Sequence, residues 1–424
     1  MASDYIPRIV DHELDELIEG LPAISLEGPR GVGKTETALR RAGTVYRLDD
    51  PDLLAIIEAQ RSRLVEGRSP ILVDEWQRLP ESWDIVRRAV DEDHSPGRFL
   101  LTGSARPTRR PTHSGAGRIV TVRMRPMSLA ERLGEPTVSL RSLLSGGRPD
   151  VEGDTGITLV DYVAEILRSG FPAIRRLSGR LLRSALDGYL DRVVERDFED
   201  LGHRIRDPGT VRRWLTAYAA ATSTAASFET LRDAASAGEA NKPARSTIQP
   251  YRATLEQLWL IEEVPAWRPT RNRLRRLAAA PVHQIADPAL AARLLGCDEQ
   301  ALLEGSSPGP AVHRDGPLLG ALFQSLVTLS VRTYAQQNEA RVHHLRTHGG
   351  EHEIDLIVER GDGRVVALEV KLSSTVSDRD IRHLRWLSER IGPELLDAAV
   401  ITTGPQAYRR RDGIGVIPAA LLTM

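Results

Sequence analysis

The chain has 424 residues, of which 57 are basic and 58 acidic, and its formal net charge at pH 7 is −1. A chain so close to neutrality has no overall attraction for nucleic acid, so any such binding must come from local patches. Its single cysteine, Cys297, excludes an internal disulfide, and no apolar run is long enough to span a membrane. The first residues, MASDYIPRIVDHELDELIEG, lack a secretory signal. We therefore expect a cytoplasmic protein with no membrane partner.

The first 126 residues alternate short apolar segments with helical ones, a pattern typical of a parallel α/β sheet. LPAISLE (21–27) indicates a buried strand, and TETALRRAG indicates a helix after the glycine-rich segment GPRGVGKT. YRLDD, PILVDEW and RFLLTGSA indicate three further strands with helical segments between them. We therefore expect an N-terminal α/β domain over residues 1–130.

GPRGVGKT matches the pattern G-x-x-x-x-G-K-T and lies between a strand and a helix, which is the context that this motif requires. Backbone N–H groups of such a loop surround phosphates, and the helix N-terminus adds partial positive charge. Lys34 would reach the β- and γ-phosphates of ATP, and the Thr35 hydroxyl would coordinate Mg²⁺. The predicted nucleotide-binding residues are Gly28, Pro29, Arg30, Gly31, Val32, Gly33, Lys34 and Thr35.

Acidic and polar residues at the ends of later strands suit the same chemistry. In ILVDEW (71–76), Asp74 would hold the Mg²⁺ through water, and Glu75 would orient and activate the attacking water. Thr102, in FLLTGSA, is placed to sense the γ-phosphate. Arg118, in GAGR, is a candidate arginine finger for the nucleotide of a neighbouring subunit. An ordinary surface arginine is the alternative for Arg118 in a chain so rich in arginine.

The middle of the chain is mainly helical. The stretch 139–156, which contains SLLSGGRPDVEGDTG, predicts a loop or linker within a linker and helical region at 131–205. Apolar residues recur at three- and four-residue spacing from 158 to 265. Residues 206–268 add a short helix, a glycine-containing turn, a second helix beginning near Ser246, and a strand, which is the outline of a winged helix-turn-helix. Another small helical domain would give similar spacing.

Two further segments complete the chain. RPTRNRLRR (268–276) packs five arginines into nine residues at the start of a basic connector, 269–310. LLGALFQSLVTLSVRTYAQ then indicates an amphipathic helix, and strand-like segments from 342 to 371 precede a helix and another strand. This order predicts a second α/β domain at 311–424.

EIDLIVERGDGRVVALEVK (353–371) predicts a β-hairpin. If Gly361–Gly363 is a three-residue loop, Asp355 lies opposite Glu369, and Glu353 lies opposite Lys371. Two carboxylates directly across a ladder lie about 5 Å apart and repel each other unless a cation lies between them. Mg²⁺ suits such hard oxygen ligands, and a neighbouring lysine could stabilise a pentacoordinate phosphate. A solvated acidic face is the alternative.

The lysine count favours a chemical role for Lys371. Only three of the 57 basic residues are lysine, and two of them, Lys34 and Lys371, occupy motif positions of two phosphate chemistries. HHLRTHGGEHE holds four histidines, but it lacks a cysteine partner, so we interpret them as incidental rather than as a zinc site. They are His343, His344, His348 and His352.

The chain resembles the prokaryotic ATP-binding proteins that join an AAA-type ATPase domain to a C-terminal domain of unknown function similar to PD-(D/E)XK nucleases. The resemblance covers nearly the whole chain. It rests on GPRGVGKT, ILVDEWQRLP, LLTGSA, GRIVTVRMRPMSLAE, RSGFPA, YLDRVVERDF, QIADPAL, LLGALFQSLV and HEIDLIVERGDGRVVALEVK. It implies an α/β multidomain fold with a P-loop ATPase domain, a helical and winged-helix middle, and a C-terminal domain like a restriction endonuclease. Asp355, Glu369 and Lys371 take the D, E and K positions, with the two carboxylates as metal ligands.

One departure concerns the helix before the nuclease-like core, where Gln324 stands in place of an acidic residue that such nucleases often carry. AAA-type proteins usually assemble as rings, so the resemblance also implies a homo-oligomer. The leading hypothesis is an ATPase that remodels or moves along duplex or branched DNA. The alternatives are a metal-dependent DNA nuclease regulated by ATP, and an ATP-driven switch that acts on a protein partner through an inert nuclease fold.

Overall fold

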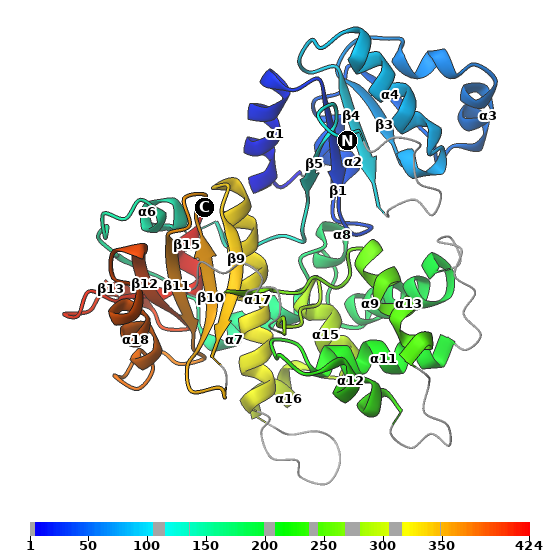
Figure 1. Ribbon diagram of the computed structural model, residues 1–424. Coiled ribbons are helices and arrows are strands. Elements are labelled where there is room, and N and C mark those ends of the chain that lie inside the picture. Colours follow the sequence, from blue (N-terminus) through cyan, green and yellow to red (C-terminus); the bar gives the residue numbers. More distant parts are fainter. Residues whose placement is uncertain are drawn as a thin grey trace.

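The computed structural model describes residues 5–104, 115–134, 136–198, 208–236, 245–267, 280–304, 316–347 and 349–424. Figure 1 shows an N-terminal sheet with its helices, a helical region below it, and a second sheet formed mainly by the C-terminal residues. Among the helices of the described residues, none is long and apolar enough to cross a membrane.

The N-terminal region is a five-stranded parallel sheet in the order β2-β3-β4-β1-β5. The elements are α1 (Ile9–Gly20), β1 (Ala23–Glu27), α2 (Lys34–Leu39), β2 (Thr44–Arg47), α3 (Pro51–Ala59), β3 (Ile71–Asp74), α4 (Glu81–Glu92), β4 (Phe99–Gly103) and β5 (Val120–Arg123). Strands β3 and β4 are buried along their whole length, because helices cover both faces of such a sheet. The predicted parallel α/β sheet is confirmed.

The helical region follows the first sheet. It consists of α7 (Leu159–Arg168), α8 (Pro172–Arg175), α9 (Gly179–Arg192), a π-helical turn (Val193–Asp197), α11 (Pro208–Ala220), α12 (Phe228–Ala235), α13 (Arg245–Gln257), α15 (Pro288–Leu294) and α16 (Glu299–Glu304). After α13, bridges between Ile261 and Ile285 and between Val264 and Val282 form a short antiparallel ladder. The arginine-rich stretch 268–276 lies outside the described residues, which end at Trp267 and resume at residue 280.

The C-terminal region contains an eight-stranded sheet in the order β7-β13-β14-β12-β11-β10-β9-β8. Its elements are α17 (Gly316–Gln337), β9 (Arg341–Arg346), β10 (Glu353–Glu359), β11 (Val365–Val370), α18 (Arg382–Ile391), β12 (Leu395–Thr402), β13 (Gln406–Arg409), β14 (Gly415–Pro418) and β15 (Leu422–Thr423), joined by β7 (Gly153–Asp154) and β8 (Ala266–Trp267). The sheet packs α18 against one face and α17 against the other.

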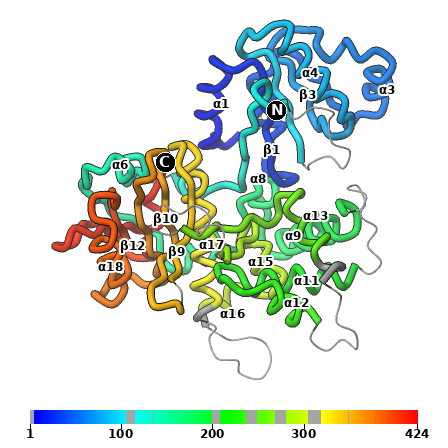
Figure 2. The backbone as a smooth tube through the Cα atoms, in the orientation of Figure 1, coloured from blue at the N-terminus to red at the C-terminus, as the bar shows by residue number. Residues whose placement is uncertain are grey.

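The stretch 139–156, which the sequence predicted as a loop or linker, instead completes the C-terminal region. Strand β6 (Val138–Ser139) pairs with β15, and β7 pairs with β13. Between them, α6 (Leu140–Leu144) buries three leucines against the core. Figure 2 shows this segment beside the C-terminal strands. Glycine and proline content marks turns correctly here, but buried leucines decide that the segment belongs to a core.

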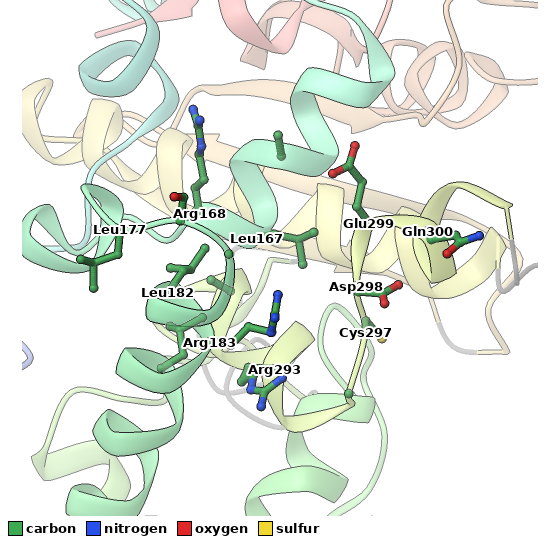
Figure 3. Close-up of a pocket in the computed structure, with 16 residues that line it drawn as sticks. Leu167, Arg168, Leu177, Leu182, Arg183, Arg293, Cys297, Asp298, Glu299 and Gln300 are labelled. Atoms are coloured by element: carbon green, nitrogen blue, oxygen red, sulfur yellow. The ribbon is translucent and has the colours of Figure 1, made fainter. Parts of the chain in front are cut away.

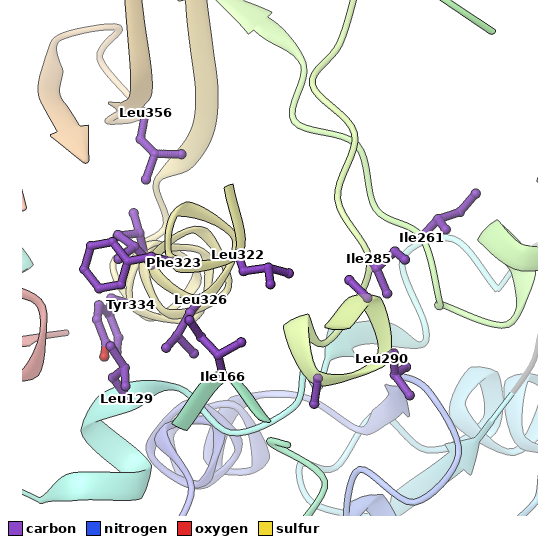
Figure 4. Close-up of a cluster of buried hydrophobic side chains, with 14 of the residues drawn as sticks. Leu129, Ile166, Ile261, Ile285, Leu290, Leu322, Phe323, Leu326, Tyr334 and Leu356 are labelled. Atoms are coloured by element: carbon purple, nitrogen blue, oxygen red, sulfur yellow. The ribbon is translucent and has the colours of Figure 1, made fainter. Parts of the chain in front are cut away.

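A continuous apolar core connects the three regions through α17. Figure 4 shows Leu322, Phe323 and Leu326 of this helix among side chains from α7, α15 and β10. Almost every turn of α17 is buried on several faces, so this helix, which its sequence indicated as amphipathic, lies at the centre of the fold. The short helix α5 (Leu129–Leu133) is joined to α17 by a hydrogen bond from Ala130 N to the Tyr334 hydroxyl, at 3.0 Å.

Candidate nucleotide and metal sites

The P-loop follows β1 and has the backbone conformation that its glycines permit. Gly31 and Gly33 have φ angles of 76° and 106°, which side-chain-bearing residues rarely adopt. A Cβ on Gly28 would lie 2.1 Å from the Met124 carbonyl oxygen, so only glycine fits there. The Lys34 ammonium donates to the carbonyl oxygens of Gly28 (2.8 Å) and Pro29 (2.9 Å). The loop therefore has the left-handed glycines and the close backbone approach that are typical of a phosphate-binding loop.

Asp74, at the end of β3, faces the first helical turn after the P-loop. The Thr35 hydroxyl donates to Asp74 Oδ1 at 2.8 Å, and the Thr102 hydroxyl donates to the same oxygen. Asp74 and Thr102 are neighbours in the register of β3 and β4. A hydroxyl and a carboxylate that meet beside a phosphate loop are the hard oxygen donors that Mg²⁺ prefers, so these residues fit the predicted metal. Thr102 is fully buried and orients Asp74.

Glu75 has a left-handed backbone conformation, with φ of 55°, that turns its side chain away from the strand direction. The Ser104 hydroxyl donates to Glu75 Oε2 at 2.9 Å, and the Gln77 amide donates to the same carboxylate oxygen. No motif in the sequence predicts a role for Ser104 or Gln77. Their signal was position alone, since Ser104 follows the end of β4 and Gln77 lies two residues beyond Glu75. These contacts hold the carboxylate in one orientation.

Arg118 lies on the surface, where its Nε donates to Asp91 of α4 at 2.8 Å. Its side chain is 45% exposed, as expected for either of the two interpretations given above. Its action on a neighbouring subunit stays a prediction.

Arg8, which precedes α1, contacts the P-loop, and no motif in the sequence predicts this contact. It is 4% exposed, donates from Nη1 to the Val32 carbonyl at 2.9 Å, and forms a buried ion pair with Glu131 at 3.0 Å. A second hydrogen bond to the P-loop comes from the helical region, where the Tyr189 hydroxyl donates to the Arg30 carbonyl at 3.3 Å. The P-loop is thus supported from both sides.

Nucleotide affinity is expected to fall above pH 8. Burial lowers the pKa of Lys34 to about 8, and a bound phosphate would raise it again by favouring the charged form. Binding free energy from this lysine is therefore fully present below pH 8 and is lost as pH rises towards the pKa of the bound state. Calorimetric titration with ADP between about pH 7 and 9.5 should show the Kd rising up to about tenfold per pH unit.

Lys34→Ala is the control for this prediction, because its weaker affinity should not change over the same pH range. A native chain whose affinity is also constant from pH 7 to 9.5 would contradict the assignment.

The β10–β11 hairpin has the predicted register. Arg360 N donates to Arg364 O at 2.9 Å, which closes the three-residue loop, and Leu356 pairs with Leu368. Continuing this register places Asp355 opposite Glu369. The ladder with β11 begins at Leu356, so Glu353 does not pair with Lys371; it lies beside Arg346 of β9 instead. The hairpin face of the acidic pair also buries apolar residues against α18: Ile357, Val365 and Ala367.

Asp355 and Glu369 form a coupled acidic pair. Burial raises the pKa of Glu369 well above its usual range, and the neighbouring Asp355 raises it further. Lys371 Nζ lies 3.3 Å from Glu369 Oε2, and Val370 N donates to Asp355 at 2.8 Å. Glu369 Oε1 is buried and has no hydrogen-bond partner among the described residues. A buried acidic pair with one unsatisfied oxygen fits the predicted hard cation, whose other ligands would be water.

Gln324, on α17, stands where a third acid was expected from the resemblance and donates from its amide to Asp355 at 3.0 Å. Within the described part of the chain, no group of three or more histidine, cysteine or acidic side chains could hold a metal ion. The predicted metal site is therefore a two-carboxylate site.

The histidines of the segment 343–352 have separate partners. His343 lies 3.3 Å from a Glu359 oxygen, His344 contacts the Ala280 carbonyl, and His352 stacks on Trp386. His348 lies outside the described residues.

A cavity of about 680 Å³ lies in the helical region, among α7, α9, α15 and the start of α16. Figure 3 shows Leu167 and Leu182 on its wall, with Arg168, Arg183 and Arg293 nearby. None of its lining residues is a predicted site residue, so we place the nucleotide at the carboxyl ends of β1 and β3.

Three family models match separate parts of the chain. An AAA domain model matches residues 21–133, a domain of unknown function (DUF8612) matches residues 159–301, and a second domain of unknown function (DUF4143) matches residues 319–422. The P-loop on a parallel sheet, together with the AAA match, identifies residues 21–133 as an AAA-type ATP-binding domain. The nuclease resemblance of the C-terminal region stays a prediction.

Two curated relatives are uncharacterized proteins of Mycobacterium tuberculosis and Mycobacterium bovis. Each is 27% identical over 406 residues, covering 94% of this chain and 80% of the relative. Among solved structures, the Walker-type ATPase of Pyrococcus abyssi has 17% identity, a TM-score of 0.41 and coverage of 69% of this chain and 96% of its own. The ORC2 protein of Aeropyrum pernix has 15% identity, a TM-score of 0.29 and coverage of 69% and 94%.

Proposed function

We propose that this protein hydrolyses ATP and uses the reaction to remodel DNA or to move along it. The observation that carries the ATPase part is the meeting of the P-loop, which follows β1, with Asp74 and Glu75 at the end of β3, where the two parallel strands flank β4. Lys34 would leave the Gly28 and Pro29 carbonyls to contact the phosphates. Thr35 and Asp74 would hold Mg²⁺, which supplies positive charge against the triphosphate.

Glu75 would serve as the general base of the reaction. Its carboxylate accepts hydrogen bonds from Ser104 and Gln77, which would hold it in position for the attacking water. The water would lose a proton to this carboxylate as it attacks the γ-phosphate in line with the leaving oxygen. A homo-oligomeric ring would place Arg118 at the nucleotide of the next subunit.

The DNA part rests on two features. The succession of α12, α13 and an antiparallel ladder has the order of a winged helix-turn-helix, in which one helix enters the major groove. The hairpin of the C-terminal region brings Lys371 beside a two-carboxylate site, which suits a phosphodiester backbone. Arginines at 268–276 would add phosphate contacts and make the binding strongly dependent on salt.

Steady-state ATP turnover should be measured with no DNA, single strands, duplex and a four-way junction, with Lys34→Ala as the blank. We expect DNA to raise turnover several-fold, and the best activator identifies the substrate class. An ATP turnover rate that is the same with and without each DNA would favour the alternative in which the protein is an ATP-driven switch acting on a protein partner. The same mixtures, analysed on gels with Mg²⁺ or Mn²⁺, test the nuclease alternative, which requires cleavage that Asp355→Ala abolishes.

A further inference from the structure

An ion pair joins the P-loop to the helical region. The Arg30 guanidinium, through Nη1, contacts the carboxylate of Asp197 in the π-helical turn after α9. Asp197 is only 3% exposed. The Phe171 and Tyr189 rings, 5.0 Å apart, lie in the same contact, and Figure 1 shows α8 and α9 directly below the end of β1. The P-loop arginine is therefore held by a different region of the chain.

Arg30 also reaches the groups that would surround the γ-phosphate. Its Nε lies 3.5 Å from the Ser104 hydroxyl, which in turn donates to Glu75. Ser104 thus contacts both Arg30 and Glu75, so these two side chains border a common space. A γ-phosphate that Lys34 binds, and that is attacked by a water activated by Glu75, would lie in that space.

We propose that Arg30 contacts the γ-phosphate of bound ATP and stabilises the charge of the transition state. Asp197 is then a positioning residue that holds Arg30 until ATP binds. This inference deepens the proposed ATPase function and rests on it. A guanidinium matches phosphate oxygens with two parallel hydrogen bonds, and a triphosphate carries more charge than one carboxylate. ATP would therefore draw Arg30 from Asp197, whereas ADP, which has no γ-phosphate, would not.

The same exchange connects the nucleotide to the helical region. A buried carboxylate that loses a cationic partner is unfavourable in its low-dielectric surroundings. A shift of the π-helical turn would relieve that cost, and such turns often occur at functional sites. Binding of ATP, but not of ADP, would in this way move α9 and the helices packed on it.

The test compares Arg30→Ala, Arg30→Lys and Asp197→Asn in the full chain, using ATP turnover and calorimetric binding of ATPγS and ADP. Arg30→Ala should lower turnover by about 100-fold and weaken ATPγS far more than ADP. Arg30→Lys should restore only part of the turnover, because it lacks the planar fork. Asp197→Asn should bind ATPγS several-fold tighter relative to ADP, since the competing carboxylate is gone.

Asp187→Asn is the control, because it removes an ion pair with Arg293 from α9, the helix before the π-helical turn, and away from the P-loop. It should leave the ratio of ATPγS to ADP affinity unchanged. Equal losses of both nucleotides in Arg30→Ala, or an unchanged ratio in Asp197→Asn, would overturn the proposal and leave a structural ion pair. Should the native chain bind ATP without hydrolysing it, the binding ratios still decide the role of Arg30 separately from the ATPase proposal.

Discussion

Glu75→Gln should lower ATP turnover by about 100-fold or more while nucleotide affinity stays within about threefold of the native value. Glutamine keeps the size of the side chain and can still accept the hydrogen bond from Ser104. It cannot take a proton from water, so the attacking water loses its general base. The variant should therefore bind ATP and retain it, which single-turnover assays with labelled nucleotide would show directly.

Glu92→Gln is the control for this result, because Glu92 is exposed at the end of α4 and lies outside the predicted site. It should hydrolyse ATP at the native rate. If Glu75→Gln did the same while Lys34→Ala was inactive, another group would have to activate the water.

Asp287→Ala should destabilise the helical region by about 3–5 kcal/mol and lower ATP turnover with it. Asp287 is fully buried and accepts from the Ser169 hydroxyl (2.6 Å), Gly170 N (2.7 Å) and Ala289 N (2.9 Å). The third contact caps α15, and the first two hold the turn before Phe171. Alanine would leave three buried donors without their acceptor.

This turn also supports the P-loop. Ser169 has a strained φ of 72°, which the contacts of Asp287 stabilise. Pro172, at the start of α8, packs near Gly33, so a loosened turn would weaken the nucleotide site as well. Hydrogen exchange of residues 166–175, together with the thermal midpoint, would measure the destabilisation.

Asp298→Ala provides the comparison, because Asp298 also accepts from a backbone N–H at a helix start but is exposed. Its loss should cost about 1 kcal/mol or less. Equal stability of the two variants would mean that the contacts of Asp287 are replaceable by water.

Local sequence was sufficient for the parts of the site that lie within one motif. The glycines of the P-loop, Lys34 and Thr35 could be placed because a loop between a strand and a helix needs only neighbouring residues to form. Asp74 and Thr102 were placed at strand ends for the same reason, and parallel strands bring such ends to one edge. The hairpin register followed from a three-residue loop, since side chains alternate strictly along each strand.

Contacts between distant segments could not be read in this way. RSGFPA and QIADPAL were visible as separate stretches, but only the folded chain brings Ser169 and Gly170 to Asp287. The pair of Arg30 and Asp197 spans 167 positions, and either residue alone has the pattern of a surface charge. Their partners depend on how helices pack on the sheet, which no periodicity in the chain encodes.

Local signals in the chain were enough to predict a P-loop on a parallel sheet, with candidate residues for binding ATP and Mg²⁺ beside it. Three features appear only in the folded chain: residues 138–154 pair with C-terminal strands, α17 is central, and Asp197 of the helical region forms an ion pair with the P-loop. Apolar burial and ion pairing stabilise contacts between surfaces of the folded chain, and those surfaces come from segments far apart in the sequence.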